Sequence, residues 1–291
     1  MSYRGRFAPS PTGELHFGSL VAALASWLRA RQQRGQWLVR VEDIDPPREV
    51  AGSSQSILAA LQQLTLTADE PPLFQSQRGD AYAKALQELR ADGHAFPCWC
   101  SRAELETENT LHRDGRCISS PRGGREPAWR LHVPDLDIAF DDGLQGPQRQ
   151  NVREAVGDFV LKRADGLWSY QLACAVDDAF QRITEVVRGY DLLDSTPRQI
   201  LLQRLLGLPT PAYLHLPLAL DTEGRKLSKS SDAPPIDARE PGATLARALR
   251  FLGQPAPEIP DIQAMLRLAA DRFDLPALHR LTARPADISP D

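Results

Sequence analysis

The sequence lacks a long apolar run. No segment approaches the roughly 18 consecutive apolar residues that a membrane-spanning helix needs, and the N-terminal Met-Ser-Tyr-Arg-Gly-Arg has no apolar stretch of the kind found in signal peptides. Hydrophobic residues make up 42% and charged residues 25% of the chain, values typical of soluble globular proteins. These features argue against a membrane protein and a disordered chain, and they predict a cytoplasmic protein.

An excess of positive charge is also missing. The net charge is −4, which argues against the globally basic character of many nucleic-acid binders but leaves room for a local basic patch. Cysteine is scarce: there are four, and three of them cluster at positions 98, 100 and 117. Such a cluster in a cytosolic protein more often binds a metal, or has no role, than forms disulfides. A chain of 291 residues can bury a full core without disulfides.

The N-terminal part reads as strand, loop, helix and strand. Residues 3–7 are typical of a strand, a loop rich in proline follows, and leucines at 20, 24 and 28 share one face of a helix. Residues 37–41 are rich in β-formers and follow Gly35, which is well placed to stop that helix. The pattern predicts a βαβ unit with a parallel strand pair, and so an α/β protein.

The rest of the chain predicts an insertion and a helical end. Ser53 or Ser54 could cap a helix, another helix is expected over 80–91, and a hairpin is expected at 163–166, leading into an extended segment over 167–172. Residues 194–197 signal a helix start and 213–220 a strand. The predicted units are 1–95, the first half of a catalytic domain; 96–126, an inserted cysteine-containing subdomain; 127–235, the second half; and 236–291, a short helical unit.

The loop between the first strand and the first helix could hold a phosphate. Free backbone N–H groups at a helix start attract anions, and this is where open α/β sheets bind ligands. Gly13 and Gly18 let the backbone approach a ligand closely, and His16 can donate to a phosphate oxygen. An ordinary proline-rich crossover with a surface histidine is the alternative.

A second phosphate-binding candidate is Lys226-Leu-Ser-Lys-Ser230, which follows a strand and a tight turn. Its two ammonium groups and two hydroxyls could neutralise the charge that builds on a leaving pyrophosphate. A solvated basic turn is the alternative interpretation. The presence of both motifs in one chain favours nucleotide chemistry.

Together the two motifs resemble the HIGH and KMSKS signatures of class I aminoacyl-tRNA synthetases. His16-Phe-Gly-Ser19 stands for the first and residues 226–230 for the second. The run Arg6-Phe-Ala-Pro-Ser-Pro-Thr-Gly13 is similar to the start of glutamyl- and glutaminyl-tRNA synthetases. Further matches, in the same order as in that group, lie at 40–45, 76–78, 176–178 and 187–191, so the resemblance covers roughly residues 3–235.

This resemblance implies a Rossmann-type domain that activates an amino acid with ATP, with Mg²⁺ arriving on the ATP phosphates. Guanidinium groups suit the two carboxylates of glutamate, and a carboxylate suits its ammonium group. Arg188 and Glu42 could instead be structural ion-pair partners. The implied residues are, for catalysis, His16 and Lys229; for ATP, His16, Gly18, Lys226 and Lys229; for glutamate, Arg6, Phe7, Ala8, Pro9, Ser10, Glu42, Tyr170 and Arg188.

Only about 60 residues follow Ser230, fewer than the helical anticodon-binding region of ordinary glutamyl-tRNA synthetases needs. The shortened form, with its clustered cysteines, is similar to the glutamyl-Q tRNA(Asp) synthetase family, which transfers glutamate to queuosine in the anticodon loop of tRNA(Asp). We therefore expect L-glutamate, ATP and that stem-loop as partners of a monomer. A truncated glutamyl-tRNA synthetase charging tRNA(Glu) and a catalytically silent tRNA-binding paralogue are the alternatives.

The resemblance also implies a zinc site at Cys98, Cys100 and Cys117. A structural zinc site needs four ligands, and the related enzymes have a tyrosine four residues before the last cysteine, where this chain has Arg113. Arginine cannot ligate, so His112, a water molecule or an empty site are the alternatives. Cys174 lies in an apolar stretch and is expected in the core.

RNA contacts leave a faint signal. A single-stranded loop can be held by stacking and a few basic side chains without an overall positive charge. The candidates for such a patch are Arg198, Arg204, Arg247 and Arg250, with solvated helix faces as the alternative for most of them.

Overall fold

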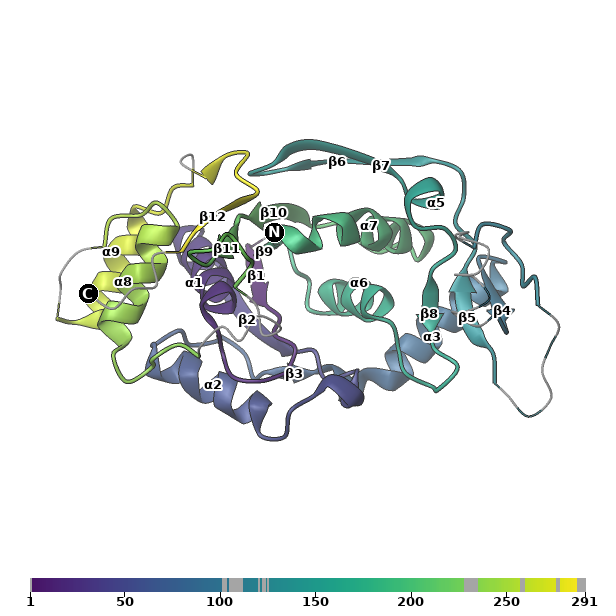
Figure 1. Ribbon diagram of the computed structural model, residues 1–291, viewed down its shortest axis with the longest axis horizontal. Helices are drawn as coiled ribbons and strands as arrows, with labels where there is room; N and C mark the ends of the chain where they lie inside the picture. Colours follow the sequence, from purple (N-terminus) through teal and green to yellow (C-terminus); the bar gives the residue numbers. More distant parts are fainter. Residues whose placement is uncertain are drawn as a thin grey trace.

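The computed structural model describes residues 2–100, 104, 112–119, 121, 124, 126–227, 235–256, 260–275 and 278–286. Strands and helices alternate over most of this length (Figure 1). The strands are β1 (Arg4–Phe7), β2 (Gln36–Val41), β3 (Leu73–Phe74), β4 (Ala95–Cys98), β5 (Ala128–Leu131), β6 (Asp137–Asp142), β7 (Gly146–Asn151), β8 (Val160–Lys162), β9 (Glu185–Gly189), β10 (Ala212–Leu216), β11 (Leu218–Leu220) and β12 (Ala283–Pro285). The α-helices are α1 (Phe17–Gln32), α2 (Ser53–Gln63), α3 (Gly79–Ala91), α5 (Val152–Ala155), α6 (Tyr170–Phe180), α7 (Thr196–Leu205), α8 (Pro241–Phe251) and α9 (Ile262–Asp271), with 3₁₀ turns at Pro46–Arg48, Gln75–Arg78 and Tyr190–Ser195.

The central strands form a parallel arrangement in the order β3-β2-β1 followed by β9-β10-β6. The two groups meet where β1 lies beside β9, because the backbone N–H of Thr184 donates to the Arg4 carbonyl at 2.9 Å. From β1 the chain runs outward through β2 to β3, and from β9 it runs outward in the other direction to β10. The boundary between β1 and β9 is therefore the switch point where open α/β sheets bind ligands. The predicted Rossmann-type fold is confirmed.

Helices cover both faces of this sheet, and the side chains of its strands alternate between two cores. On β9, Val187 joins the core under α1, whereas Val186 joins the core under α6 and α7. On β10, Leu214 and Tyr213 divide in the same way. Successive side chains of a strand point to opposite faces of the sheet. Whether a residue occupies an odd or an even position along its strand therefore decides which of the two cores it joins.

The region after β4 contains two antiparallel structures. Strands β4, β5 and β8 form a small sheet at the end of the molecule opposite α8 and α9, and the β6–β7 hairpin runs along one side of the body (Figure 1). The sequence did not predict this hairpin. The hairpin turn expected at 163–166 is present, because the Arg163 N–H donates to the Leu167 carbonyl at 2.8 Å and Lys162 pairs with Trp168. The extended segment expected after it is wrong beyond Trp168, because the Ser169 side chain accepts from Leu172 N and α6 begins at Tyr170.

Two small residues have roles other than the predicted ones. Helix α1 ends with Arg34 in the left-handed region (φ 50°), not with Gly35. Gly35 is small for a different reason: a Cβ there would lie 2.4 Å from the Tyr3 carbonyl oxygen. Ser53 does not cap α2 with its side chain; its Oγ accepts from the Gly13 N–H at 2.8 Å and so ties α2 to the N-terminal loop.

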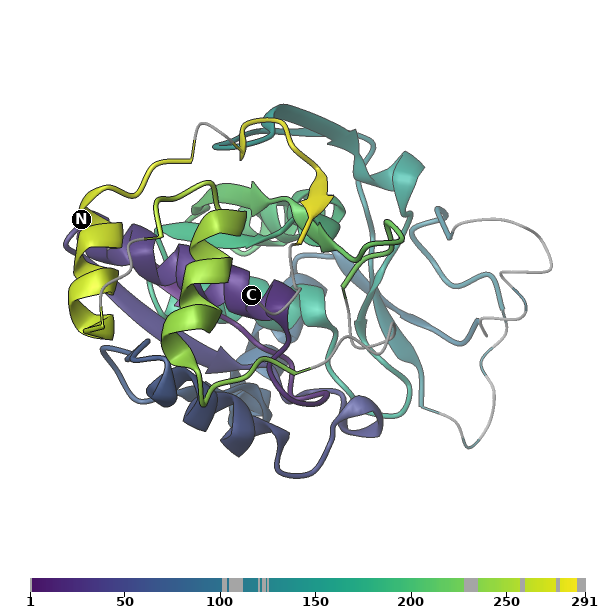
Figure 2. The same ribbon diagram turned by 60° about the vertical axis from the view of Figure 1, so that its left-hand side comes forward.

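The C-terminal helices share a core with the N-terminal helix. Figure 2 shows α8 and α9 against α1, and the rings of Phe17 and Phe251 meet edge to face at 5.7 Å. Strand β12 pairs in parallel with β11, a contact that the sequence did not predict. The division of the chain into four units stays a prediction. No helix in the described part of the chain is both long and apolar enough to cross a membrane.

Candidate functional site

Four neighbouring strands each place one basic side chain on the same face of the sheet. Arg40 comes from β2, Arg6 from β1, Arg188 from β9 and His215 from β10, and all are between 0 and 4% exposed. Their strand neighbours, such as Phe7 and Val187, enter the core under α1. By alternation these basic groups form a row under α6 and α7. We call Arg40, Arg6, Arg188 and His215 the basic row.

One polar face of helix α6 packs against the basic row. Tyr170, Cys174 and Asp178 lie four residues apart and therefore share a helix face. Asp178 Oδ1 accepts from Arg40 Nη1 at 2.7 Å and from Arg6 Nε at 3.1 Å. Burial tends to raise the pKa of Asp178, but the two guanidinium groups outweigh it and hold the pKa at about 2. One carboxylate thus balances part of the charge of two buried arginines.

Glu42 and Cys174 complete the buried network on this side. Glu42 Oε1 lies 3.3 Å from Arg40 Nη2, and burial raises the pKa of Glu42 although Arg40 and Arg6 oppose the rise. The Cys174 thiol lies 3.3 Å from Arg40 Nη2, and burial raises its pKa to about 12. The expected burial of Cys174 in the core is confirmed, although the residue also contacts charged groups there.

Among the described residues, all hydrogen-bond partners of Arg188 are neutral, which distinguishes it from the other two arginines. Nε donates to His215 Nε2 at 3.0 Å. Nη1 donates to Tyr170 Oη at 3.3 Å and to Gln199 Oε1 at 2.9 Å, and Nη2 to the Leu192 carbonyl at 3.3 Å and to Thr196 Oγ1 at 2.7 Å. The two 3.3 Å contacts are partly buried, whereas those with Gln199 and Thr196 are fully buried. A buried cation without a carboxylate in contact is suited to receive an anion.

His215 holds Arg188 from behind as a neutral imidazole. Arginine can only donate, so His215 Nε2 accepts and the ring proton sits on Nδ1, which lies 2.6 Å from Asp142 Oδ2. Burial, together with Arg188, lowers the pKa of His215 even though Asp142 acts in the opposite direction. Asp142 also accepts from the backbone N–H groups of Leu144 and Gln145, and its pKa is lowered.

The N-terminal loop contacts the described residues on both sides of 228–234. His16 caps α1, and its ring nitrogens contact Ser19 N at 3.3 Å and Ser19 Oγ at 2.9 Å. On one side of residues 228–234, a Cβ at Gly18 would lie 3.4 Å from the Leu227 carbonyl oxygen. On the other side, the N–H of Ile236 donates to the Leu15 carbonyl at 3.0 Å. The residues directly before and after 228–234 therefore both contact the start of α1.

Of the predicted phosphate-binding lysines, Lys226 lies among the described residues. Lys226 Nζ pairs with Asp191 Oδ2 at 2.6 Å, which links the lysine segment to the end of β9. Gly189 makes room for this carboxylate, because a Cβ there would lie 2.6 Å from Asp191 Oδ1. Lys229, predicted to be catalytic, lies outside the described residues.

The predicted glutamate residues at the end of β1 differ in what they can offer. Phe7 is buried and stacks on Trp37, with ring centroids 6.4 Å apart, so only its backbone can reach a ligand. The Pro9 carbonyl accepts from the Glu42 N–H at 2.9 Å, which couples the loop to β2. Ala8 is half-buried and Ser10 is exposed.

The three predicted metal ligands form a cluster away from the basic row. The sulfur atoms of Cys98, Cys100 and Cys117 lie within 4.8 Å of one another, and Cys100 and Cys117 are 3.8 Å apart. The backbone N–H of Trp99 donates to Cys117 Sγ at 3.1 Å. Sulfurs bound at about 2.3 Å to one tetrahedral zinc ion would lie about 3.8 Å apart, so the cysteines fit zinc.

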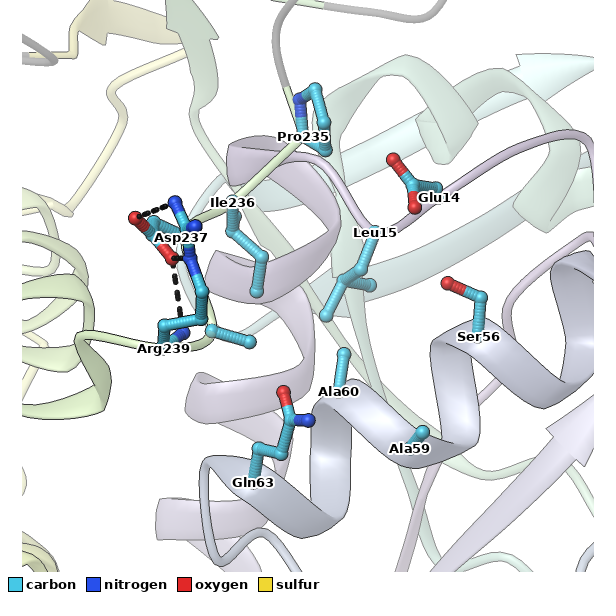
Figure 3. Close-up of a pocket in the computed structure, with 11 residues that line it drawn as sticks. Glu14, Leu15, Ser56, Ala59, Ala60, Gln63, Pro235, Ile236, Asp237 and Arg239 are labelled. Carbon is cyan, nitrogen blue, oxygen red and sulfur yellow. Dashed lines mark hydrogen bonds and ion pairs between the residues drawn. The ribbon is translucent and has the colours of Figure 1, made fainter.

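A surface pocket of about 460 Å³ contains none of the predicted site residues. It lies between α2, the residues before α1 and the segment after residue 234 (Figure 3). Asp237 and Arg239, on its wall, pair with each other at 2.9 Å and offer no converging charge to a ligand.

The four candidate RNA contacts do not make one patch. Arg198 and Arg204 are on α7, whereas Arg247 and Arg250 are on α8, and Figure 1 shows α7 and α8 in different parts of the molecule. Arg198 donates to Ser195 Oγ, and burial lowers its pKa.

Sequence reasoning did not single out four members of this site: Arg40, Asp178, His215 and Asp142. Arg40 and Asp178 lie within segments that carry the family resemblance, so motif membership was an available signal. His215 and Asp142 had none, because their partner Arg188 is brought to them only by strand pairing.

A family model agrees with this geometry. Residues 2–239 match the model for tRNA synthetases class I (E and Q), catalytic domain. The chain is 56% identical to a glutamyl-Q tRNA(Asp) synthetase of Burkholderia mallei over 262 residues, which cover 86% of this chain and 88% of the relative. It is 54% identical to the protein of that name from Xanthomonas axonopodis pv. citri over 275 residues, covering 93% and 91%.

Solved structures show the same likeness. A crystal structure of a glutamate tRNA ligase from Elizabethkingia meningosepticum, in complex with its amino acid, superposes with a TM-score of 0.83 at 26% identity. The match covers 99% of this chain and 67% of that one.

Proposed function

The chain belongs to the class I tRNA synthetases of the glutamyl and glutaminyl type, and from this premise we propose that it activates L-glutamate with ATP and transfers the glutamyl group to queuosine in the anticodon loop of tRNA(Asp). The relatives at 54–56% identity support this acceptor by their name. The observation that carries the amino-acid part is the buried Arg188 guanidinium, whose five hydrogen-bond acceptors among the described residues are all neutral.

Arg188 is proposed to hold a substrate carboxylate. Its partly buried contacts with Tyr170 and Leu192, both 3.3 Å, are the ones that a carboxylate would replace or join. A charged acceptor makes a stronger hydrogen bond than a neutral one. Arg6 offers a second guanidinium near Tyr170, and Glu42 offers a carboxylate for the substrate ammonium. Glutamate carries this set of charges.

Positioning is the main contribution of the protein to the first step. The glutamate α-carboxylate attacks the α-phosphorus of ATP, a new C–O–P linkage forms, and pyrophosphate leaves with the electron pair of the broken P–O bond. His16 at the start of α1, with Lys226 and Lys229, is proposed to stabilise the phosphate charge, while Mg²⁺ bound to the ATP phosphates would share it. In the second step a queuosine hydroxyl attacks the glutamyl carbonyl and AMP leaves.

The experiment uses the full-length protein with ATP, labelled glutamate and three RNAs. We expect glutamate-dependent ATP–pyrophosphate exchange without RNA, and label transfer only to tRNA(Asp) that contains queuosine. The same tRNA(Asp) with guanosine at that position is the matched control. Transfer to tRNA(Glu) would instead show a truncated glutamyl-tRNA synthetase, and the absence of both exchange and transfer would show a protein without this activity.

A further inference from the structure

His112 has an unusual environment for a buried histidine. It is 4% exposed, and its Nδ1 lies 3.0 Å from Asp158 Oδ2. Asp158 is fixed in turn by the backbone N–H groups of Val133 at 2.9 Å and Gly115 at 2.8 Å. Nε2, the other ring nitrogen, is buried and has no hydrogen-bond partner among the described residues. A buried polar atom without a partner is costly and points to a missing ligand or ion.

The cysteine cluster lies next to this nitrogen. The side chains of Cys98 and His112 interact directly. Because Asp158 occupies Nδ1, this interaction comes from Nε2, which makes no hydrogen bond of regular geometry. The orphaned nitrogen therefore faces the thiol of Cys98.

We propose that His112 Nε2 is the fourth protein ligand of a zinc site formed with Cys98, Cys100 and Cys117. Three cysteines leave one position of a tetrahedral structural site open, and the 3.8 Å separation of the Cys100 and Cys117 sulfurs equals the spacing that tetrahedral zinc requires. The site is independent of the proposed catalytic function, since it lies in the insertion and not on the basic row.

Arg113, the residue at the position of the tyrosine in related enzymes, is turned away from the cluster. Its Nε donates to the Arg153 carbonyl at 2.9 Å, and its Nη2 donates to the Glu154 carbonyl. The guanidinium group is thus held at the end of α5. This orientation removes Arg113 from the site and leaves His112 as the adjacent side chain with a lone pair to offer.

Asp158 has the role expected of a residue that supports a zinc ligand. A ligating histidine commonly donates its second N–H to a carboxylate, which fixes the tautomer and aims the other nitrogen at the metal. The Nδ1–Asp158 contact achieves this here. On binding, the ion would replace the protons of the thiols and of Nε2, which pass to solvent. Phe96, with its ring 5.4 Å from that of His112, packs against the imidazole.

The test measures the metal directly in the full-length protein. We expect one zinc per chain, an X-ray absorption signal from three sulfurs at about 2.3 Å and one nitrogen at about 2.0–2.1 Å, and displacement of zinc by a chelator. His112→Ala should weaken zinc binding by at least about 100-fold, because loss of a supporting carboxylate alone costs about 10–100-fold. His112→Cys should restore tight binding with four sulfurs around the ion.

Two control variants remove other side chains of the same region: Arg113, which is held at the end of α5, and His132, whose ring lies beside Gly115. Arg113→Ala and His132→Ala should leave the zinc affinity and the absorption signal unchanged, because neither side chain is a ligand. A wild type that binds no zinc, or zinc bound with equal affinity by His112→Ala, would overturn the proposal. Should His112→Ala fail to fold, the count of four sulfurs in His112→Cys decides: three sulfurs and a light atom in that variant would also overturn it.

Discussion

Two buried histidine–aspartate pairs of nearly identical construction occur among the described residues. His112 Nδ1 lies 3.0 Å from Asp158 in the insertion, and His215 Nδ1 lies 2.6 Å from Asp142 beside the basic row. In both pairs the aspartate accepts from backbone N–H groups as well, and its pKa is lowered. Each pair therefore presents Nε2 of a firmly held imidazole to its surroundings.

The two histidines nevertheless have opposite electrostatics. The hydrogen bond with Asp158 and the interaction with Cys98 raise the pKa of His112 to about 10, whereas burial and Arg188 lower the pKa of His215. The aspartate raises the pKa of the histidine in both pairs, so the difference comes from burial, which outweighs Asp142 at His215, and from the partner at Nε2. That partner is a thiol that can become an anion in one pair and a permanent cation in the other. The first arrangement suits a metal ion, and the second keeps an arginine in position with a neutral acceptor.

The largest effect on activity is expected when Arg188, the cation that contacts His215, is replaced by a neutral residue. Arg188→Met should lower kcat/KM for glutamate in ATP–pyrophosphate exchange by at least about 10³-fold, because a buried site built to bind a polar group loses about 10⁴–10⁵ when the match is removed. The same change should raise the pKa of His215, since the opposing charge has gone while Asp142 remains. Steady-state kinetics and NMR titration of the histidine ring measure the two effects.

Arg149→Met, which removes an exposed arginine from β7, is the control for that experiment. It should change neither the kinetics nor the His215 signal. Full exchange activity in Arg188→Met would contradict the role given to this residue.

Replacing each of the two aspartates with asparagine should have smaller effects, and each variant should affect a different property, either glutamate binding or zinc binding. Asp142→Asn should raise KM for glutamate about 10-fold or more and leave zinc affinity unchanged, because it disturbs only the residue that holds Arg188. Asp158→Asn should weaken zinc binding about 10–100-fold and leave the KM for glutamate unchanged. Each variant should also lose about 1.5–3 kcal/mol of unfolding free energy, the value of a hydrogen bond to a charged group.

Each aspartate variant is the control for the other. Kinetics, chelator competition and urea unfolding on both proteins complete the comparison. If both variants lost glutamate binding and zinc to the same extent, the two pairs would not be separate devices, and the losses would reflect general destabilisation.

The sequence predicted the βαβ start and the glutamyl-type motifs because these signals are local. Arg6, Glu42 and Arg188 lie in short runs that carry the family resemblance. Their role as neighbours on one sheet face follows from strand parity, which is also visible in sequence once the strands are known. The fold class could therefore be predicted well, and the candidate site in part.

The two histidine–aspartate pairs could not be predicted in the same way. Asp142 and His215 are 73 residues apart and meet because β6 pairs with β10, and no motif announces that pairing. His112 and Asp158 are 46 residues apart, and they meet across the small antiparallel region. Side chains that are brought together by long-range pairing leave no periodic signal along the chain.

The smallest effect is a dependence of stability on pH that comes from His215. Its pKa is lowered in the fold, while the unfolded chain has the ordinary value of about 6.5. The unfolded state then binds more protons below about pH 6.5, so the stability that His215 contributes is present above that pH and is lost as the pH falls toward its folded-state pKa. One proton gives a slope of at most about 1.4 kcal/mol per pH unit. The charged and titratable groups that face the ring are Arg188, Asp142, whose pKa is lowered, and Tyr213, whose pKa burial raises to about 12.

Urea unfolding of the wild type and of His215→Gln at pH 7.5, 6.5 and 5.5 isolates this contribution, because the two proteins differ only at residue 215. Glutamine keeps an oxygen that can accept from Arg188 but has no proton to gain. Between pH 6.5 and 5.5 the unfolding free energy of the wild type should fall by about 1 kcal/mol relative to that of the variant. A difference that stays constant over this range would mean that His215 titrates alike in both states, and the contrast with His112 would then rest on the metal site alone.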